Sequence, residues 1–285
     1  MRVLFCTDGS KISYHSIQNF SNWAKNFTVD ILCAIDWSFL PDTVSVEDSE
    51  FGSMCANSAD SILNYSENFL SELGFNIEDK IKMCGAAVDC ILEACNKKDY
   101  NCIVLGSHGK RGIQKWLGSV SQEVASASDI STYITKERNS GSRVLFTVDS
   151  SDLTYSAIIN CLDLYDFTDK IIELITVYEI PDYLFLEGNI DSNWILDINK
   201  KQETASVLLL NKFERVINDR GYTISNKTVL SGTPSTEIIK YISKNNVDLV
   251  VCGIHNRKYL SKFLLSSVSK RILEGAISDV LLIRP

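Results

Sequence analysis

Glycines and hydroxyl residues in the middle of the chain have the spacing of an anion-binding loop. The apolar, β-branched run 101–105 predicts a buried strand that ends in glycine, and a helical pattern begins at 119. Because the first N–H groups of a helix lack intrahelical acceptors, these groups and nearby hydroxyls are expected to face the mouth of the loop. Such an arrangement favours binding of phosphate oxygens. The residues concerned are Gly106, Gly109, Gly118, Ser119 and Ser121.

The loop differs from two common phosphate loops. No Gly-Lys-Ser/Thr follows the glycines, which excludes the Walker pattern. The segment is also too long for the dinucleotide fingerprint, in which a tight turn opens the helix directly. On the motif alone, a glycine-rich surface loop without function is the alternative.

The glycine pattern resembles the signature of the universal stress protein family, Gly-x2-Gly-x9-Gly-Ser/Thr, in which the loop holds the phosphates of ATP. Gly106, Gly109, Gly118 and Ser119 match this signature. Eight residues rather than nine separate Gly109 from Gly118. The resemblance therefore implies a phosphate pocket that is shifted or tighter than the family's.

Length and composition indicate two globular domains. The chain has 285 residues, of which 45% are hydrophobic and 22% charged. A net charge of −8 argues against nucleic acid and anionic membranes as partners. Nine scattered cysteines without a Cys-x2-Cys pair predict reduced, buried thiols, as in Cys33 and Cys252. With no signal-like segment and no apolar run of about 18 residues, we expect a cytoplasmic protein.

An internal repeat shows that one fold occurs twice. Arg2-Val3-Leu4-Phe5, with Asp8 and Ser10 after it, returns as Arg143-Val144-Leu145-Phe146 with Asp149 and Ser151. Ser119-Val120-Ser121 returns as Ser267-Val268-Ser269, and His108 returns as His255. A polar linker at 137–142 separates the copies. We therefore expect domains at 1–138 and 142–285.

The elements that position the loop alternate between strand and helix, which predicts a parallel α/β sheet. The strands are expected at 2–7, 29–37, 75–84, 101–105 and 130–135, and at 143–148, 171–177, 222–230, 247–252 and 280–283. A polar, irregular segment at 38–53 precedes a long helix whose buried stripe runs from Ala59 to Leu73. Its counterpart in the second copy is expected at about 200–220.

The resemblance covers both copies and implies two tandem, Rossmann-like domains of the adenine nucleotide alpha hydrolase-like type. Each would hold a five-stranded parallel sheet ordered 3-2-1-4-5. Strands one and four are then neighbours whose connections leave to opposite faces, which is where such sheets bind ligands. Asp8 and Gly106 lie at the carboxyl ends of these two strands.

By resemblance, Thr7 and Asp8 line the adenine-ribose end of a site in the first copy, near the backbone of Ile35. A helix cap is the alternative role for Asp8. The ribose and phosphates would be held by Leu105, Gly106, His108, Gly109, Gly118, Ser119, Val120 and Ser121. The resemblance implies ATP or AMP as the ligand, with or without Mg²⁺, and no metal ligand is assigned.

The second copy departs further from the signature. It keeps Gly253 but has Asn256 in place of the second glycine and Ser266 in place of the third. Side chains at these positions add bulk where the backbone should meet phosphate. We therefore expect a site that is empty or takes a smaller nucleotide. Its weaker candidate residues are Asp149, Gly253, His255, Ser267 and Ser269.

The resemblance implies a cytosolic stress protein whose N-terminal half binds the adenine nucleotide and whose bound state changes the interaction with an unknown protein partner. The alternative is a structural or interaction protein whose shortened loop has closed the pocket. No catalytic residue is assigned, because the loop offers only His108 and hydroxyls, and hydrolysis of ATP would at most be slow. We expect an intramolecular pseudo-dimer through the fifth strands, with a homodimer as a further arrangement.

Overall fold

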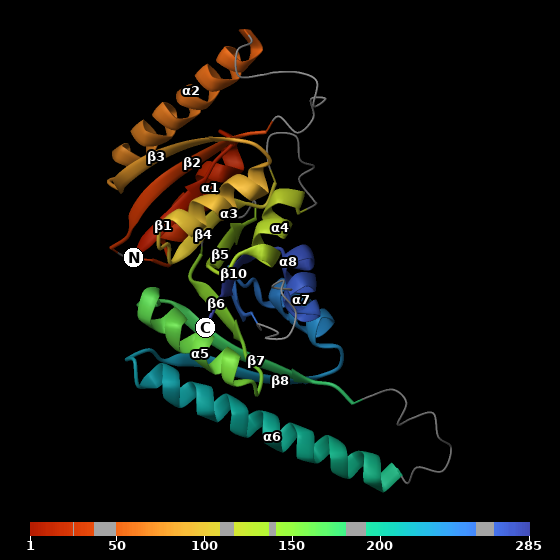
Figure 1. Cartoon of the computed structure of the whole chain (residues 1–285). Helices are drawn as coiled ribbons and strands as arrows, with labels where there is room; N and C mark the ends of the chain where they lie inside the picture. Colours follow the sequence, from red (N-terminus) through yellow and green to blue (C-terminus); the bar gives the residue numbers. More distant parts are fainter. Residues whose placement is uncertain (25, 37–49, 109–116, 137–140, 181–191, 255–264) are drawn as a thin grey trace. The chain divides into compact units, whose positions relative to one another are not determined.

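The computed structural model describes residues 1–24, 26–36, 50–108, 117–136, 141–180, 192–254 and 265–285 (Figure 1). The chain divides into two compact units, which within the described residues are 1–136 and 141–285 apart from the gaps above. The N-terminal one is called unit 1 and the C-terminal one unit 2. Each unit is described by itself.

Unit 1 is a five-stranded parallel sheet with helices on both faces. Its strands lie side by side in the order β3-β2-β1-β4-β5. The strand order changes direction at β1, so α1 and α2 cover one face while α3 packs against α4 on the other. Its elements are β1 (Arg2–Cys6), α1 (Lys11–Ser21), β2 (Thr28–Ile35), α2 (Glu50–Glu72), β3 (Asn76–Cys84), α3 (Ala87–Lys97), β4 (Cys102–Gly106), α4 (Ser119–Ala127) and β5 (Ser131–Thr135).

Unit 2 repeats the arrangement, with strand order β8-β7-β6-β9-β10 and all neighbours parallel. The predicted parallel α/β fold is thus present in both units. Its elements are β6 (Arg143–Thr147), α5 (Asp152–Leu164), β7 (Ile171–Tyr178), α6 (Ser192–Asn218), β8 (Ile224–Ser231), α7 (Pro234–Asn245), β9 (Leu249–Gly253), α8 (Ser267–Gly275) and β10 (Asp279–Ile283).

The central strands form the core of each unit. β1 and β4 are almost fully buried, as are β6 and β9. They are continuous apolar runs rather than alternating ones because both faces of a parallel sheet are covered by helices. The edge strand β3 instead alternates between exposed and half-buried positions. The residues nearest the candidate loop therefore stand on the most deeply buried part of the sheet.

Four predicted details of the helices and thiols are wrong. α6 begins at Ser192, eight residues before the predicted start at 200, because its first turns carry exposed apolar residues such as Leu196 and so show no buried stripe. Leu73 is 45% exposed, since it lies beyond the end of α2 at Glu72. The segment predicted as irregular at 38–53 overlaps α2, which begins at Glu50, and 37–49 lies outside the described residues. Cys84 is exposed, whereas Cys33 and Cys252 are buried as expected.

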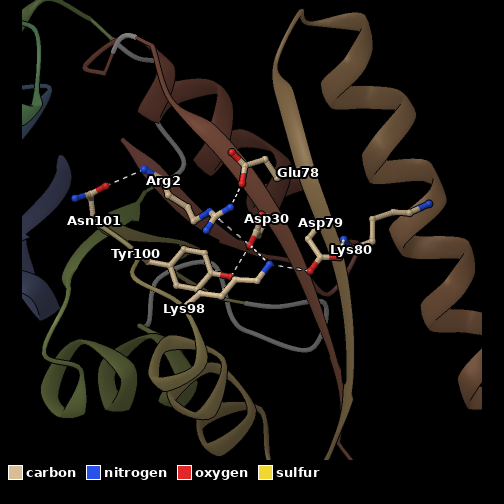
Figure 2. A network of polar contacts seen from close by, with 8 residues as sticks. All are labelled: Arg2, Asp30, Glu78, Asp79, Lys80, Lys98, Tyr100 and Asn101. Carbon is tan, nitrogen blue, oxygen red and sulfur yellow. Dashed lines mark hydrogen bonds and ion pairs between the residues drawn. The ribbon is translucent and has the colours of Figure 1, made fainter.

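A charged network lies at the amino ends of the strands of unit 1 (Figure 2). The carboxylate of Asp30 in β2 is completely buried, and its Oδ2 atom accepts hydrogen bonds from Tyr100 Oη at 2.7 Å and Lys98 Nζ at 2.8 Å. Lys98 also pairs with Asp79 of β3 at 2.8 Å, and Arg2 pairs with Glu78. The network ties the connection between α3 and β4 to the edge of the sheet.

The network shifts the pKa values of its members in the directions that strengthen it. The hydrogen bond to Asp30, followed by the one to Asp79, raises the pKa of Lys98. Burial first and the Asp30 hydrogen bond second raise the pKa of Tyr100, which keeps its hydroxyl protonated as a donor. Because a buried carboxylate is costly unless it is paired, these donors stabilise Asp30 in the core.

Unit 2 holds its buried acid with a different donor. Arg143 pairs with the buried carboxylate of Glu173 in β7, at the position of Asp30. The hydroxyl comes from Tyr241 in α7, which donates to Glu173 Oε2 at 3.1 Å, and not from a residue between the third helix and the fourth strand, as Tyr100 does in unit 1. The two units therefore share the buried acid and its pairing with an arginine of the first strand, but the hydroxyl donor comes from different elements.

Candidate functional site

A cavity of about 530 Å³ opens at the carboxyl ends of β1 and β4 in unit 1. This is the point where the strand order changes direction, which is where parallel sheets of this kind present their ligand sites. The cavity is bounded by the ends of three strands and by the first turns of α3 and α4. Its lining includes Cys6, Thr7, Asp8, Ser13, Leu32, Ala34, Asp36, Ala87, Ile91, Leu105, Gly106, His108, Gly118, Ser119, Val120 and Ser121.

Asp8 shapes the turn that leads into α1, although it is not the helix cap. Its Oδ1 atom accepts the backbone N–H of Ser10 at 2.9 Å, and Ser10 is the cap, accepting the N–H of Ser13. Asp149 and Ser151 repeat this turn, also at 2.9 Å. The helix-cap role considered for Asp8 therefore belongs to Ser10. The exposed carboxylate of Asp8 lines the cavity.

Thr7 is buried and held in a chain of hydroxyls. Its Oγ1 atom lies 2.8 Å from Ser13 Oγ and accepts the N–H of Gly9 at 3.0 Å. Ser13 Oγ in turn donates to the carbonyl of Ser10. This side of the cavity is therefore polar but already hydrogen-bonded, and Asp8 is its exposed acceptor.

Glycine is required at the end of β4 by close packing. A Cβ atom on Gly106 would lie 3.0 Å from the side chain of Ile12 and 3.2 Å from the backbone of α1. β4 can therefore approach α1 closely enough to bring the following loop to the end of β1. Gly118 has an ordinary φ of −67°, so its role is not conformational. Gly109 lies outside the described residues.

The N-terminus of α4 faces the cavity without a side-chain cap. Gly118 occupies the cap position, and the first intrahelical bond is donated by Gln122 N–H to Gly118 O at 3.1 Å. The N–H groups of Ser119, Val120 and Ser121 precede that bond, and the glycine cap offers no side-chain oxygen to accept them. All three residues line the cavity. This is the geometry of an anion site.

Two groups expected at the loop mouth are used elsewhere. The N–H of Gly118 donates to the carbonyl of Ser107 at 2.6 Å, so it closes the loop on itself. The hydroxyl of Ser121 donates to the carbonyl of Gly106 at 2.6 Å and is buried. Both residues line the cavity, but these two donors are already used within the loop. The site is left with backbone donors from the first turn of α4 and the exposed Ser119.

His108 and Leu105 line the cavity, whereas Ile35 is absent from its lining. His108 Nδ1 lies 3.1 Å from Ser107 Oγ, and its ring is half-buried. The carbonyl of Ile35 accepts the N–H of Gly85 at 2.9 Å. Because side chains alternate along a strand, the residues on either side of Ile35, Ala34 and Asp36, face the cavity instead.

The equivalent cavity in unit 2 is smaller, at about 220 Å³. Asp149, Gly253 and Ser269 line it, whereas Ser267 is absent from its lining and Val268 is present. His255 and Asn256 lie outside the described residues. Ser266 caps α8 with its hydroxyl, which accepts the N–H of Ser269 at 3.0 Å. In unit 2 the Ser266 side chain thus accepts a helix N–H group whose counterpart in unit 1 receives no side-chain acceptor from the glycine cap.

Metal-ligand clusters and membrane helices are not seen in the described parts of the chain. No three His, Cys, Asp or Glu side chains there are grouped to hold a metal ion. None of the helices in those ranges is long and apolar enough to cross a membrane.

Comparisons with known proteins agree with the repeat. The model of the universal stress protein family matches residues 1–136 and again 142–284. Universal stress protein MJ0531 of Methanocaldococcus jannaschii is 23% identical over 155 residues, which cover 54% of this chain and 89% of that protein. Universal stress protein C of Escherichia coli K12 is 33% identical over 82 residues, or 29% of this chain and 53% of that protein.

A solved structure shows the same two-domain fold along the whole chain. The crystal structure of a universal stress protein from Archaeoglobus fulgidus matches with a TM-score of 0.69 and 21% identity, covering 99% of this chain and 96% of that one. The predicted fold class, two tandem α/β domains of the adenine nucleotide alpha hydrolase-like type, is confirmed. With both halves matched by the family model, the chain belongs to the universal stress protein family.

Proposed function

We propose that unit 1 binds ATP or AMP in its 530 Å³ cavity and that the occupied state acts in the stress response by changing an interaction with a protein partner. The observation that carries the proposal is the uncapped N-terminus of α4 at the mouth of this cavity. The volume falls in the range of about 300–1,000 Å³ that is usual for small-molecule sites.

The phosphates would bind the first N–H groups of α4. Three such groups, from Ser119, Val120 and Ser121, precede the first intrahelical bond. The positive end of the helix dipole adds to the attraction of an anion at this point. Ser119 is exposed, so its hydroxyl can donate to the same phosphate.

The base and ribose would occupy the part of the cavity beside β2 and α3. Leu32, Ala34 and Ile91 give it an apolar wall. The carboxylates of Asp8 and Asp36 line the cavity and can accept hydrogen bonds from ribose hydroxyls. Carboxylates would repel phosphates, which favours placing the phosphates at α4.

A magnesium ion at this site would be held chiefly by the nucleotide. The described residues contain no cluster of three ligands for it. Mg²⁺ commonly binds through one or two carboxylates together with substrate phosphates and water. Asp8 and Asp36 are the exposed carboxylates of the cavity that could supply such a bond.

Calorimetry on the full chain tests the proposal. We expect ATP and AMP to bind with a stoichiometry of one per chain, and an adenine nucleotide to be released from the purified protein on denaturation and identified by mass spectrometry. If titration gives no heat and no nucleotide is released, the structural or interaction role replaces this proposal.

We further propose that the domains at 1–138 and 142–285 pair as an intramolecular pseudo-dimer. The support is the family resemblance, since each copy retains a fifth strand, at Ser131–Thr135 and Asp279–Ile283. Pairing would protect two sheet edges from other chains. Small-angle scattering should then show one compact particle, and two separated lobes would rule the pairing out.

A further inference from the structure

The two cavities are built from equivalent positions, so their differences identify what sets their size. Both first strands begin with arginine and pair with the second strand in the same register, which aligns Ala34 with Val177. Gly85 and Gly232 align the start of α3 with that of α7, and therefore Ala87 with Pro234. Ala34 and Ala87 line the cavity of unit 1, and Val177 and Pro234 line that of unit 2.

Much of the apolar wall keeps its bulk between the units. Leu32 corresponds to Ile175 and Ile91 to Ile238, and each of these residues lines its cavity. The change in volume from about 530 to about 220 Å³ therefore comes from lining positions where bulk changes, which include Ala34 and Ala87 as well as the cap at Gly118. Valine adds two methyl groups at the position of Ala34, and proline adds a ring at the position of Ala87. Both additions fall at the end of the second strand and the start of the third helix, away from the cap of the fourth helix.

Proline at the start of α7 also removes a donor. Ala87 is the first residue of α3, and its cap, Ala86, makes no side-chain hydrogen bond. The N–H of Ala87 is thus one of the donors that a helix start leaves without an intrahelical acceptor. Pro234 occupies the first position of α7 and has no N–H. Unit 1 therefore offers both space and a backbone donor where unit 2 offers neither.

We propose that Ala34 and Ala87 determine nucleotide specificity between the units, by admitting the base to unit 1, and that Val177 and Pro234 exclude it from unit 2. This inference rests on the proposed function of the unit 1 cavity. The remaining 220 Å³ lies below the usual range for a site that encloses a whole nucleotide. Unit 2 is closed at two separate places, because the Ser266 cap blocks the phosphate end independently.

The test gives unit 1 the residues of unit 2. The variant A34V/A87P is made in the full chain and titrated with ATP and with adenosine, which has no phosphate. Both substitutions suit their backbones, since valine is favourable in a strand and proline at the first position of a helix. T28I is the matched control, because it introduces another residue of unit 2 into β2 at the amino end of the strand, outside the cavity lining.

We expect A34V/A87P to weaken the binding of ATP and of adenosine by at least about tenfold, equivalent to about 1.4 kcal/mol, while T28I binds as the wild type does. Unchanged affinity of the double variant, or an equal loss in T28I, overturns the inference. If the double variant melts early, A34V alone is judged by the same criterion. Wild-type protein that binds no nucleotide would refute the proposed function itself. The inference is judged by the difference in affinity between the variants and the wild type, so the two failures are distinguishable.

Discussion

The glycine cap of α4 can be replaced by the serine cap that the chain already carries at the equivalent helix of unit 2. In G118S, the new hydroxyl should accept the N–H of Ser121, as Ser266 accepts the N–H of Ser269 at 3.0 Å. A Cβ atom at this position would lie 3.3 Å from the carbonyl of Ser107, so the loop needs to move only slightly. The substitution therefore removes one donor from the cavity mouth without disrupting the fold.

The magnitude follows from the donor that is lost. A hydrogen bond to a charged group contributes about 1.5–3 kcal/mol, so G118S should weaken ATP binding by about tenfold to a hundredfold. Serine is also a slightly better helix cap than glycine, by a few tenths of a kcal/mol. The melting temperature should therefore stay constant or rise while affinity falls, which separates loss of the site from loss of the fold.

The matched control is G118A, which adds the same Cβ atom without the oxygen. Isothermal titration of ATP into wild type, G118A and G118S measures all three affinities under one condition. G118A should retain most of the binding, although it loses some stability because alanine caps helices poorly. If G118S binds ATP as the wild type does, or if both variants lose affinity equally, the capping argument is refuted.

Three further predictions concern the fold around the site. Y100F removes the hydroxyl that donates to the buried Asp30 and should lower the free energy of unfolding by about 1.5–3 kcal/mol in urea titrations. An unchanged free energy of unfolding would mean that Lys98 alone is enough to stabilise the Asp30 carboxylate. G106A should cost about 1–3 kcal/mol and weaken ATP binding by displacing α1, and wild-type melting would show that this contact is loose. The hydrogen bond from Lys98 lowers the pKa of Asp79, so its stabilising effect is complete above the unfolded value of about 3.9 and is lost as the pH falls through the lowered folded value. K98M should therefore flatten the acid limb of stability against pH, and an unchanged limb would contradict this assignment.

The sequence is sufficient to predict the fold and the place of the cavity in unit 1, because both follow from repeated patterns. Apolar runs that alternate with helical stripes identify a parallel sheet, and Asp8 and Gly106 close the two strands where such a sheet binds ligands. The start of α6 escapes prediction because its first turns are exposed and show no periodic burial. Pattern analysis detects a helix only where the helix packs.

The details of the site depend on atoms that a motif does not specify. Which donors remain for a ligand is decided by hydrogen bonds within the loop, such as the one from Gly118 N–H to Ser107. Successive side chains along β2 point to opposite faces of the sheet, and Leu32 lines the cavity. This alternation could have indicated Ala34 and Asp36 in place of Ile35. Nothing in the sequence of the first copy marks Ala87 as a site residue. Its small side chain becomes informative only when it is compared with Pro234 at the equivalent position of the second copy.

The two helix caps also bear on how duplicated domains diverge. On the proposed function, the glycine cap keeps the phosphate end of unit 1 open at a small cost in helix stability, whereas the serine at the same position in unit 2 satisfies the helix. Losing the site by this route is therefore slightly favourable for folding. In a chain with two copies, selection for one functional pocket protects only one such glycine. A mutation from glycine to serine in the other copy then slightly increases helix stability, and the reverse mutation to glycine slightly decreases it.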